Sequence, residues 1–147
     1  MKFLTKSKSV LVLLFIIMCM PLAANAQDAQ TTDFDWEPVM DAVIQVESGG
    51  NARAVSGNSC GAMQITPICV AQCNIILKAR KSKKRYTLKD RFNVAKSKEM
   101  FLLIQSFYNA ENNIEKAIRS WNGGMRYTIK GTQRYYEKVM SHLKKAA

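Results

Sequence analysis

The chain has 147 residues, with 22 lysines and arginines against 11 aspartates and glutamates, and a formal net charge of +11. This length suits one domain with one hydrophobic core rather than several domains. The positive charge favours polyanionic partners, namely cell-wall polymers, anionic lipid headgroups or nucleic acid, and does not choose among them.

The first 26 residues have the pattern of a secretory signal. Lysines at positions 2, 6 and 8 precede an apolar run from Val10 to Met20, and Ala24-Asn25-Ala26 provides the small residues of a cleavage site. The apolar run has 11 residues, fewer than the roughly 20 that span a bilayer. We therefore expect export to the periplasm or the extracellular envelope, without a stable membrane anchor. Cleavage would leave 121 residues with a net charge of +8, because residues 1–26 hold three basic residues and no acidic one.

The composition also disfavours a metal centre. His142 is the only histidine, and it lies far along the chain from Cys60, Cys69 and Cys73, whose spacings differ from the tight pairs of zinc ribbons. We expect no metal. In an oxidising compartment the three cysteines would form one disulfide and leave one free thiol, or all three would be buried thiols, and the spacing does not decide between these alternatives.

Residues 27–34 are polar and lack an apolar period, which predicts a short flexible leader. The apolar spacing that follows predicts helices and almost no strand. The first helix should span about residues 36–47, with Asp35 as its N-cap and Gly49-Gly50 as a left-handed stop. Its apolar face would hold Trp36, Val39, Met40, Val43 and Ile44.

Four more helices are expected. The second begins at Thr66-Pro67, a cap followed by proline, and ends near residue 77. The third spans about residues 94–108, the fourth about 113–121, and the last starts near Thr132. The expected inner faces are Cys69, Cys73, Ile76 and Leu77 on the second helix, Met100, Phe101, Ile104, Phe107 and Tyr108 on the third, Ile114, Ala117, Ile118 and Trp121 on the fourth, and Tyr135, Tyr136, Val139, Met140 and Leu143 on the last. Five helices predict a compact all-α domain over residues 35–147.

A basic segment, residues 78–91, separates the second and third helices and carries eight basic residues and one acidic one. A solvated loop is the favoured interpretation, ahead of a contact for anionic wall polymers. A nucleic-acid patch ranks last, because only Tyr86 and Phe92 are near enough to stack on bases and a secreted protein rarely meets nucleic acid. We expect no nucleic-acid partner.

Glu47 interrupts the apolar pattern of the first helix. It follows Val43 by four residues and Met40 by seven, so a carboxyl group stands where the helical period calls for a core side chain. It also lies in the last helical turn, where the helix dipole disfavours an anion. Burial and the dipole would both raise its pKa and keep it protonated, as a glycosidase acid must be. An ordinary exposed glutamate on a frayed helix end is the alternative.

Four short segments follow one another along the chain in a distinctive order. They are Glu47-Ser48, Gly61-Ala62-Met63-Gln64, Ser120-Trp121-Asn122 and Gly131-Thr132-Gln133-Arg134-Tyr135. Together they resemble the Glu-Ser, Gly-Leu-Met-Gln, Ala-Tyr-Asn and Glu-Thr-Arg-x-Tyr motifs of the soluble lytic transglycosylase (SLT) family, whose fold is lysozyme-like. Each motif is short, but four in order over about residues 36–140 make a specific pattern.

The resemblance implies a role for four residues. Glu47 would be the catalytic acid and base, and Gln64 would bind the sugar beside the cleavage point. Asn122 would help to shape the substrate site, and Tyr135 would hold the catalytic carboxyl group in place at the substrate-binding groove. The sequence departs from the last motif at Gly131 and Gln133, where the family has Glu and Arg, and Tyr136 is an adjacent competitor for the role of Tyr135.

The resemblance also implies a reaction that needs one acid and no cofactor. Glu47 would protonate the glycosidic oxygen between MurNAc and GlcNAc in peptidoglycan, then help the C6 hydroxyl of the same sugar to attack C1. The product would be a 1,6-anhydro sugar. The few candidates for the second carboxylate that most glycosidases use, Asp90 and Glu99, belong to no recognised motif.

Two other functions stay open from the sequence. One is a hydrolase of the goose-type lysozyme kind, in which Asp90 or Glu99 positions a water molecule. The other is a non-catalytic wall-binding component that keeps the fold. The small size of the chain suggests local work beside an envelope-spanning secretion or conjugation apparatus.

Overall fold

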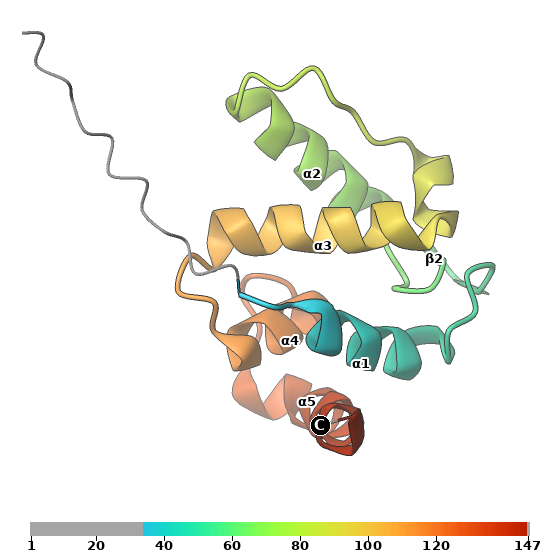
Figure 1. Cartoon of the computed structure of the whole chain (residues 1–147), viewed down its shortest axis with the longest axis vertical. Coiled ribbons are helices and arrows are strands. Elements are labelled where there is room, and N and C mark those ends of the chain that lie inside the picture. Colours follow the sequence, from blue (N-terminus) through green and yellow to red (C-terminus); the bar gives the residue numbers. More distant parts are fainter. Residues whose placement is uncertain (1–33, 147) are drawn as a thin grey trace, which may run out of the picture. The chain divides into compact units, whose positions relative to one another are not determined.

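The computed structural model describes residues 34–146 and consists mainly of helices (Figure 1). The expected all-α class is confirmed. The predicted signal peptide and all but the last residue of the predicted leader lie outside the described residues. In chain order the elements are α1 (Glu37–Ser48), β1 (Val55–Ser56), β2 (Ser59–Cys60), α2 (Pro67–Ala79), the 3-10 helix η1 (Leu88–Phe92), α3 (Val94–Tyr108), α4 (Ile114–Gly123) and α5 (Ile129–Ala146).

Local capping explains where α1 begins and ends. The Asp35 side chain accepts a hydrogen bond from the Glu37 amide at 2.9 Å, which satisfies a free N–H of the first turn. At the other end Gly49 adopts the left-handed conformation, with φ 61° and ψ 26°, so the helix ends at Ser48, one residue after Glu47. The predicted stop is present, whereas the N-cap position is Trp36 rather than Asp35, although the Asp35 side chain supplies the hydrogen bond.

The later helices use polar caps of the same kind. Thr66 accepts from the Cys69 amide, Asn93 from the Lys96 amide and Asn113 from the Lys116 amide, each through its side-chain oxygen. The predicted start of α5 near Thr132 is wrong, because the helix begins at Ile129. The Thr128 hydroxyl accepts a hydrogen bond from the Gly131 amide at 3.1 Å, which stabilises the first turn of the helix.

The basic segment between α2 and α3 is not a featureless loop. It contains η1, which the reciprocal hydrogen bonds of Thr87 and Asp90 cap at its start. Most of its lysines and arginines are exposed, as a solvated loop requires. Arg91 is the exception, since it is buried and donates to the carbonyl oxygens of Leu88 and Asn58, both at 2.9 Å.

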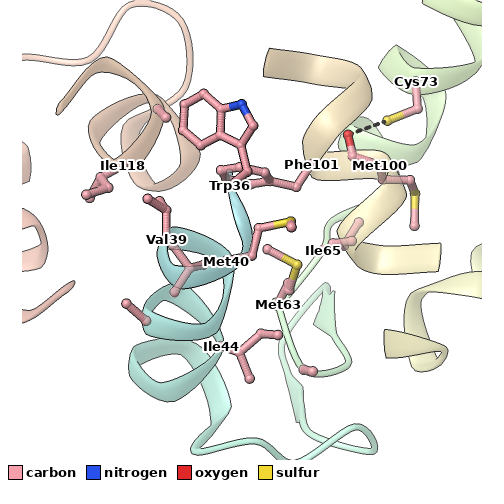
Figure 2. Close-up of a cluster of buried hydrophobic side chains, with 14 of the residues drawn as sticks. Trp36, Val39, Met40, Ile44, Met63, Ile65, Cys73, Met100, Phe101 and Ile118 are labelled. Carbon is pink, nitrogen blue, oxygen red and sulfur yellow. Dashed lines mark hydrogen bonds between the residues drawn. The ribbon is translucent and has the colours of Figure 1, made fainter. Parts of the chain in front are cut away.

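The core joins α1, α3, α4 and the segment that precedes α2 (Figure 2). Trp36 and Phe101 pack edge to face with ring centroids 5.7 Å apart, and Phe101 also meets Trp121 at 5.1 Å. Phe34, the last residue of the predicted leader, packs on Trp36 at 4.6 Å.

Figure 1 shows α3 between α2 and α1. Lys98 on α3 forms ion pairs with the α1 carboxylates of Glu37 and Asp41.

Two of the expected inner faces are partly wrong. On α2 the buried position is Val70 rather than Cys69, which is only partly buried, while Cys73 is fully buried and donates from its thiol to the Met100 carbonyl (Figure 2). On α3 Phe107 is 47% exposed and packs on the ring of Tyr108 at the surface. The full face of α1 is buried as expected. All three cysteines of the described region are free thiols.

A tight approach holds the β-hairpin and the following turn against η1. Gly61 has a φ of 80°, and a Cβ atom built there would lie 1.7 Å from the Arg91 carbonyl oxygen. Only glycine fits both the backbone conformation and the space. This contact fixes the turn that carries Ala62, Met63 and Gln64. Within residues 34–146 no helix has the length and apolarity to cross a membrane.

Replacing Gly61 with alanine should lower the free energy of unfolding by at least about 3 kcal/mol, because backbone strain and steric overlap add. The matched control is Gly57→Ala, at a residue with φ 56° and no atom within 4 Å of the added Cβ. That variant should cost only about 1 kcal/mol, the strain alone. Urea unfolding followed by circular dichroism measures both, and equal losses would show that the close approach to Arg91 contributes nothing.

Candidate active site

An open cleft of about 380 Å³ lies where α2, the end of α3 and the end of α4 meet the turn before α2. Its polar lining residues are Glu47, Gln64, Thr66, Gln72, Tyr108, Ser120 and Asn122, and its apolar ones include Ile65, Ile68, Ile104 and Trp121. Three of the four predicted site residues, Glu47, Gln64 and Asn122, therefore border the same space. Gln64 follows Glu47 by 17 residues, whereas Asn122 lies 58 residues beyond Gln64.

Glu47 is fixed by contacts from two directions. The next residue, Ser48, donates its hydroxyl proton to the Ala62 carbonyl at 2.8 Å, which ties the end of α1 to the turn that carries Gln64. From α5, the Tyr135 hydroxyl donates to Glu47 Oε1 at 2.7 Å. The helix end, the turn and α5 thus meet at one carboxyl group.

The surroundings of Glu47 favour its protonated form. Burial raises the pKa of Glu47 above 4.5, because the charged form loses water that the protein does not fully replace. The hydrogen bond from Tyr135 acts in the opposite direction and only partly offsets burial. Burial and the nearby carboxyl group also raise the pKa of Tyr135, so its hydroxyl remains a neutral donor. The protonated form of Glu47 is therefore favoured over that of an exposed glutamate.

Tyr135 does not itself line the cleft. Its hydroxyl points to Glu47 instead, which matches the role of holding the carboxyl group rather than that of contacting a sugar. The competitor Tyr136 lies elsewhere, with its ring under the guanidinium group of Arg119 at 4.3 Å from the centroid. In the structure the hydroxyl group that contacts Glu47 is thus that of Tyr135 and not that of Tyr136.

Gln64 occupies a strained position at the edge of the cleft. Its φ of 50° is left-handed, which is uncommon for a residue other than glycine. Its side-chain amide donates to the Gly61 carbonyl at 3.0 Å and to the Ala54 carbonyl at 3.4 Å. Strained backbone of this kind often marks a functional residue, because the surrounding structure must hold it there.

Asn122 is exposed at the cleft, and its neighbour Trp121 sets its position. The Trp121 indole nitrogen donates to the Met63 carbonyl at 3.2 Å, so α4 is joined to the turn that carries Gln64. The tryptophan that stands where the family motif has tyrosine thus binds two parts of the site together. Periodicity alone assigned Trp121 to the core and missed this bond.

Sequence reasoning also missed a polar pair in the cleft. Gln72 donates its amide proton to the Tyr108 hydroxyl at 2.6 Å, which connects α2 and α3 across the cleft wall. Tyr108 had been assigned to the inner face of α3. The sequence signal for the surface position of Tyr108 is that it lies at the end of the helix, where an apolar face reaches the surface.

The two candidates for a second acid lie outside the cleft. Asp90 binds Lys96 and caps η1, and those contacts lower its pKa. Glu99 binds Lys84 and accepts from the Tyr86 hydroxyl, and Lys84 lowers its pKa in turn. Among the described residues that line the cleft, Glu47 is the only carboxylic acid.

The raised pKa of Glu47 predicts how stability depends on pH. A carboxyl group whose pKa is higher in the folded state than in the unfolded state stabilises the fold at low pH, and this stabilisation is lost as pH rises through the folded pKa. The free energy of unfolding of Glu47→Gln, relative to the parent protein, should therefore increase from pH 4 to pH 9 in urea titrations. Asp90→Asn serves as the control. Because Lys96 lowers the pKa of Asp90, its pH dependence falls below about pH 4, and its difference should stay nearly constant from pH 4 to pH 9. A constant or decreasing difference for Glu47→Gln would contradict the buried-acid description.

Comparison with known proteins agrees with the geometry. Residues 24–143 match the family model of the transglycosylase SLT domain. No curated protein and no solved structure matches the chain. The family match covers most of the sequence and all of the motifs around the cleft, and the chain therefore belongs to the SLT family of transglycosylase domains.

Proposed function

We propose that this SLT domain is an active lytic transglycosylase that cleaves the β-1,4 bond between MurNAc and GlcNAc in peptidoglycan. SLT domains act on peptidoglycan as lytic transglycosylases in general. The observation that carries the specific proposal is Glu47, a carboxyl group with a raised pKa at an open cleft that has no other acid among its described lining residues. The proposed product is a glycan end with a 1,6-anhydro-MurNAc residue.

In the first step Glu47 acts as a general acid. Its proton passes to the glycosidic oxygen, the bond from that oxygen to C1 of MurNAc breaks, and the GlcNAc end leaves as an alcohol. Positive charge develops at C1, and Glu47 is left as a carboxylate. The raised pKa supports this step because a larger fraction of Glu47 is protonated before reaction.

In the second step Glu47 acts as a general base. It takes the proton of the C6 hydroxyl of the same sugar while O6 forms a bond to C1, so Glu47 ends the cycle protonated and no water is consumed. The nucleophile belongs to the substrate and has a high effective concentration. The hydrogen bond from Tyr135 is available to stabilise the carboxylate between the two steps.

Gln64 and Asn122 are proposed to bind the sugars on either side of the cleavage point. Both line the cleft with Glu47. The side-chain amide of Gln64 donates within its own turn, so its side-chain oxygen would accept from a sugar, whereas the Asn122 amide can both donate and accept. The backbone amide of Gln64 donates to the Gly61 carbonyl at 3.2 Å, in the same turn whose Ala62 carbonyl accepts from Ser48. Substrate and acid are therefore positioned by one structural unit.

The hydrolase alternative has less support in the geometry. It requires a group that positions water, and the two acids suggested for that role are engaged in ion pairs outside the cleft. The non-catalytic alternative does not explain why a carboxyl group with a raised pKa lies at the cleft, since wall binding alone does not require one. Export through residues 1–26 is part of our proposal, and an envelope-spanning apparatus as partner stays a prediction of the sequence.

Mass spectrometry of peptidoglycan fragments tests the proposal. Insoluble peptidoglycan treated with the purified protein should release muropeptides that end in anhydro-MurNAc, with no label incorporated from isotopically labelled water. Glu47→Gln should lower the rate by roughly 10²–10⁴-fold, since it removes the group that acts as acid and base in both proposed steps. The same variant should still sediment with the insoluble wall.

Asp90→Asn is the control for the loss of a carboxyl group, and it should retain the parent rate because Asp90 lies outside the cleft. Reducing ends that carry the solvent label would contradict the transglycosylase proposal and support the hydrolase alternative. Absence of any released fragment from the parent protein, with wall binding retained, would favour the non-catalytic function.

A further inference from the structure

Arg119 on α4 is a buried cation whose contacts converge on the start of α5. It is 2% exposed. Its guanidinium group donates to the Ile129 carbonyl and the Thr132 hydroxyl, both at 3.1 Å, and to the Gln133 side-chain oxygen at 2.8 Å. A fourth bond, 2.7 Å long, joins it to Glu115, one turn earlier on α4. The positive charge of Arg119 is therefore paired with Glu115, and its other hydrogen bonds go to α5.

These contacts fix the segment that leads directly to Tyr135. The three acceptors on α5 span its first five residues, and the guanidinium group also stacks on Tyr136. The helices pack closely here, because a Cβ atom at Gly123 would lie 2.8 Å from the Thr132 methyl group. Since a helix is stiff over one turn, a clamp on residues 129–133 also sets the position of residue 135.

Stability alone does not account for this arrangement. A cation at the N-terminal end of a helix opposes the helix dipole. A buried ion pair adds little stability compared with apolar side chains of similar volume. The guanidinium group of Arg119 is rigid and planar, so it binds several acceptors at once and fixes their relative positions. Nothing within α5 supplies this, because Gly131 has no side chain and Gln133 is itself held by Arg119.

We propose that Arg119 is a positioning residue that clamps the first turns of α5 to α4 and so holds the Tyr135 hydroxyl 2.7 Å from Glu47. Arg119 does not line the cleft, and it acts on the acid only through Tyr135. The inference rests on the proposed role of Glu47 as acid and base. It assigns a function to a residue outside the four sequence motifs.

A double-mutant cycle tests the proposal through the titration of the Glu47 carboxyl carbon, followed by NMR. Tyr135→Phe removes a donor that lowers the pKa of Glu47, so it should raise the titration midpoint. Arg119→Ala should shift the midpoint in the same direction by a smaller amount. In the double variant the midpoint should equal that of Tyr135→Phe alone, because Arg119 then has nothing to position. An additive shift, or no shift in a folded Arg119→Ala, would overturn the proposal.

Two further variants keep the test decisive. If Arg119→Ala fails to fold, Gln133→Ala removes one acceptor at a partly exposed position and should give a smaller shift of the same sign. Arg134→Ala, at an exposed arginine one residue before Tyr135, is the matched control and should leave the midpoint unchanged. A midpoint moved equally by Arg134→Ala would show a general effect of charge and overturn the clamp.

Activity gives the second readout. In peptidoglycan digestion Arg119→Ala should lower kcat by roughly tenfold with little change in KM, as expected for a defect in the acid rather than in binding. Arg119→Lys should recover part of kcat, since a single ammonium group reaches fewer acceptors. A loss confined to KM would contradict the proposal. Because the titration does not require turnover, an inactive parent protein would refute the proposed function while leaving the clamp testable.

Discussion

The hydrogen bond from Tyr135 to Glu47 is the interaction on which the site depends. It joins residues 88 positions apart, so it exists only if α1 and α5 pack in one register. Each end is secured separately. Gly49 and the Ser48 bond to Ala62 hold the end of α1, and the contacts around Arg119 hold the start of α5. The cleft is the space left between these fixed parts and α2.

Glu47 illustrates a conflict between stability and function. The apolar face of α1 continues onto it, and both burial and the helix C-terminus disfavour its charged form. A glutamine there would make a more stable fold above the pKa of the carboxyl group. The structure retains the acid and surrounds it with one neutral donor, Tyr135, instead of a cation that would lower its pKa further. A neutral partner lowers the pKa of Glu47 less than a cation would, which supports the proposed role of Glu47 as an acid.

Local patterns predicted much of the fold, and long-range contacts account for what they missed. The face and stop of α1, the cap at Thr66 and the span of α3 follow from periodicity and capping. The early start of α5 depended on the Thr128 hydroxyl. The burial of Arg91 and Arg119 could not be predicted, because their partners lie on other segments. Glu47, Gln64 and Asn122 were found by motif, whereas Gln72 and Tyr108 become a pair only when α2 meets α3.

A direct titration of Glu47 in the folded parent protein tests the central claim. NMR of its carboxyl carbon, with Glu47→Gln used to assign the signal, should give a midpoint above 4.5. This midpoint should also agree with the pH at which the rate of peptidoglycan cleavage declines as the pH rises. A midpoint at or below 4.5 would contradict the claim that burial keeps Glu47 protonated for its role as the acid.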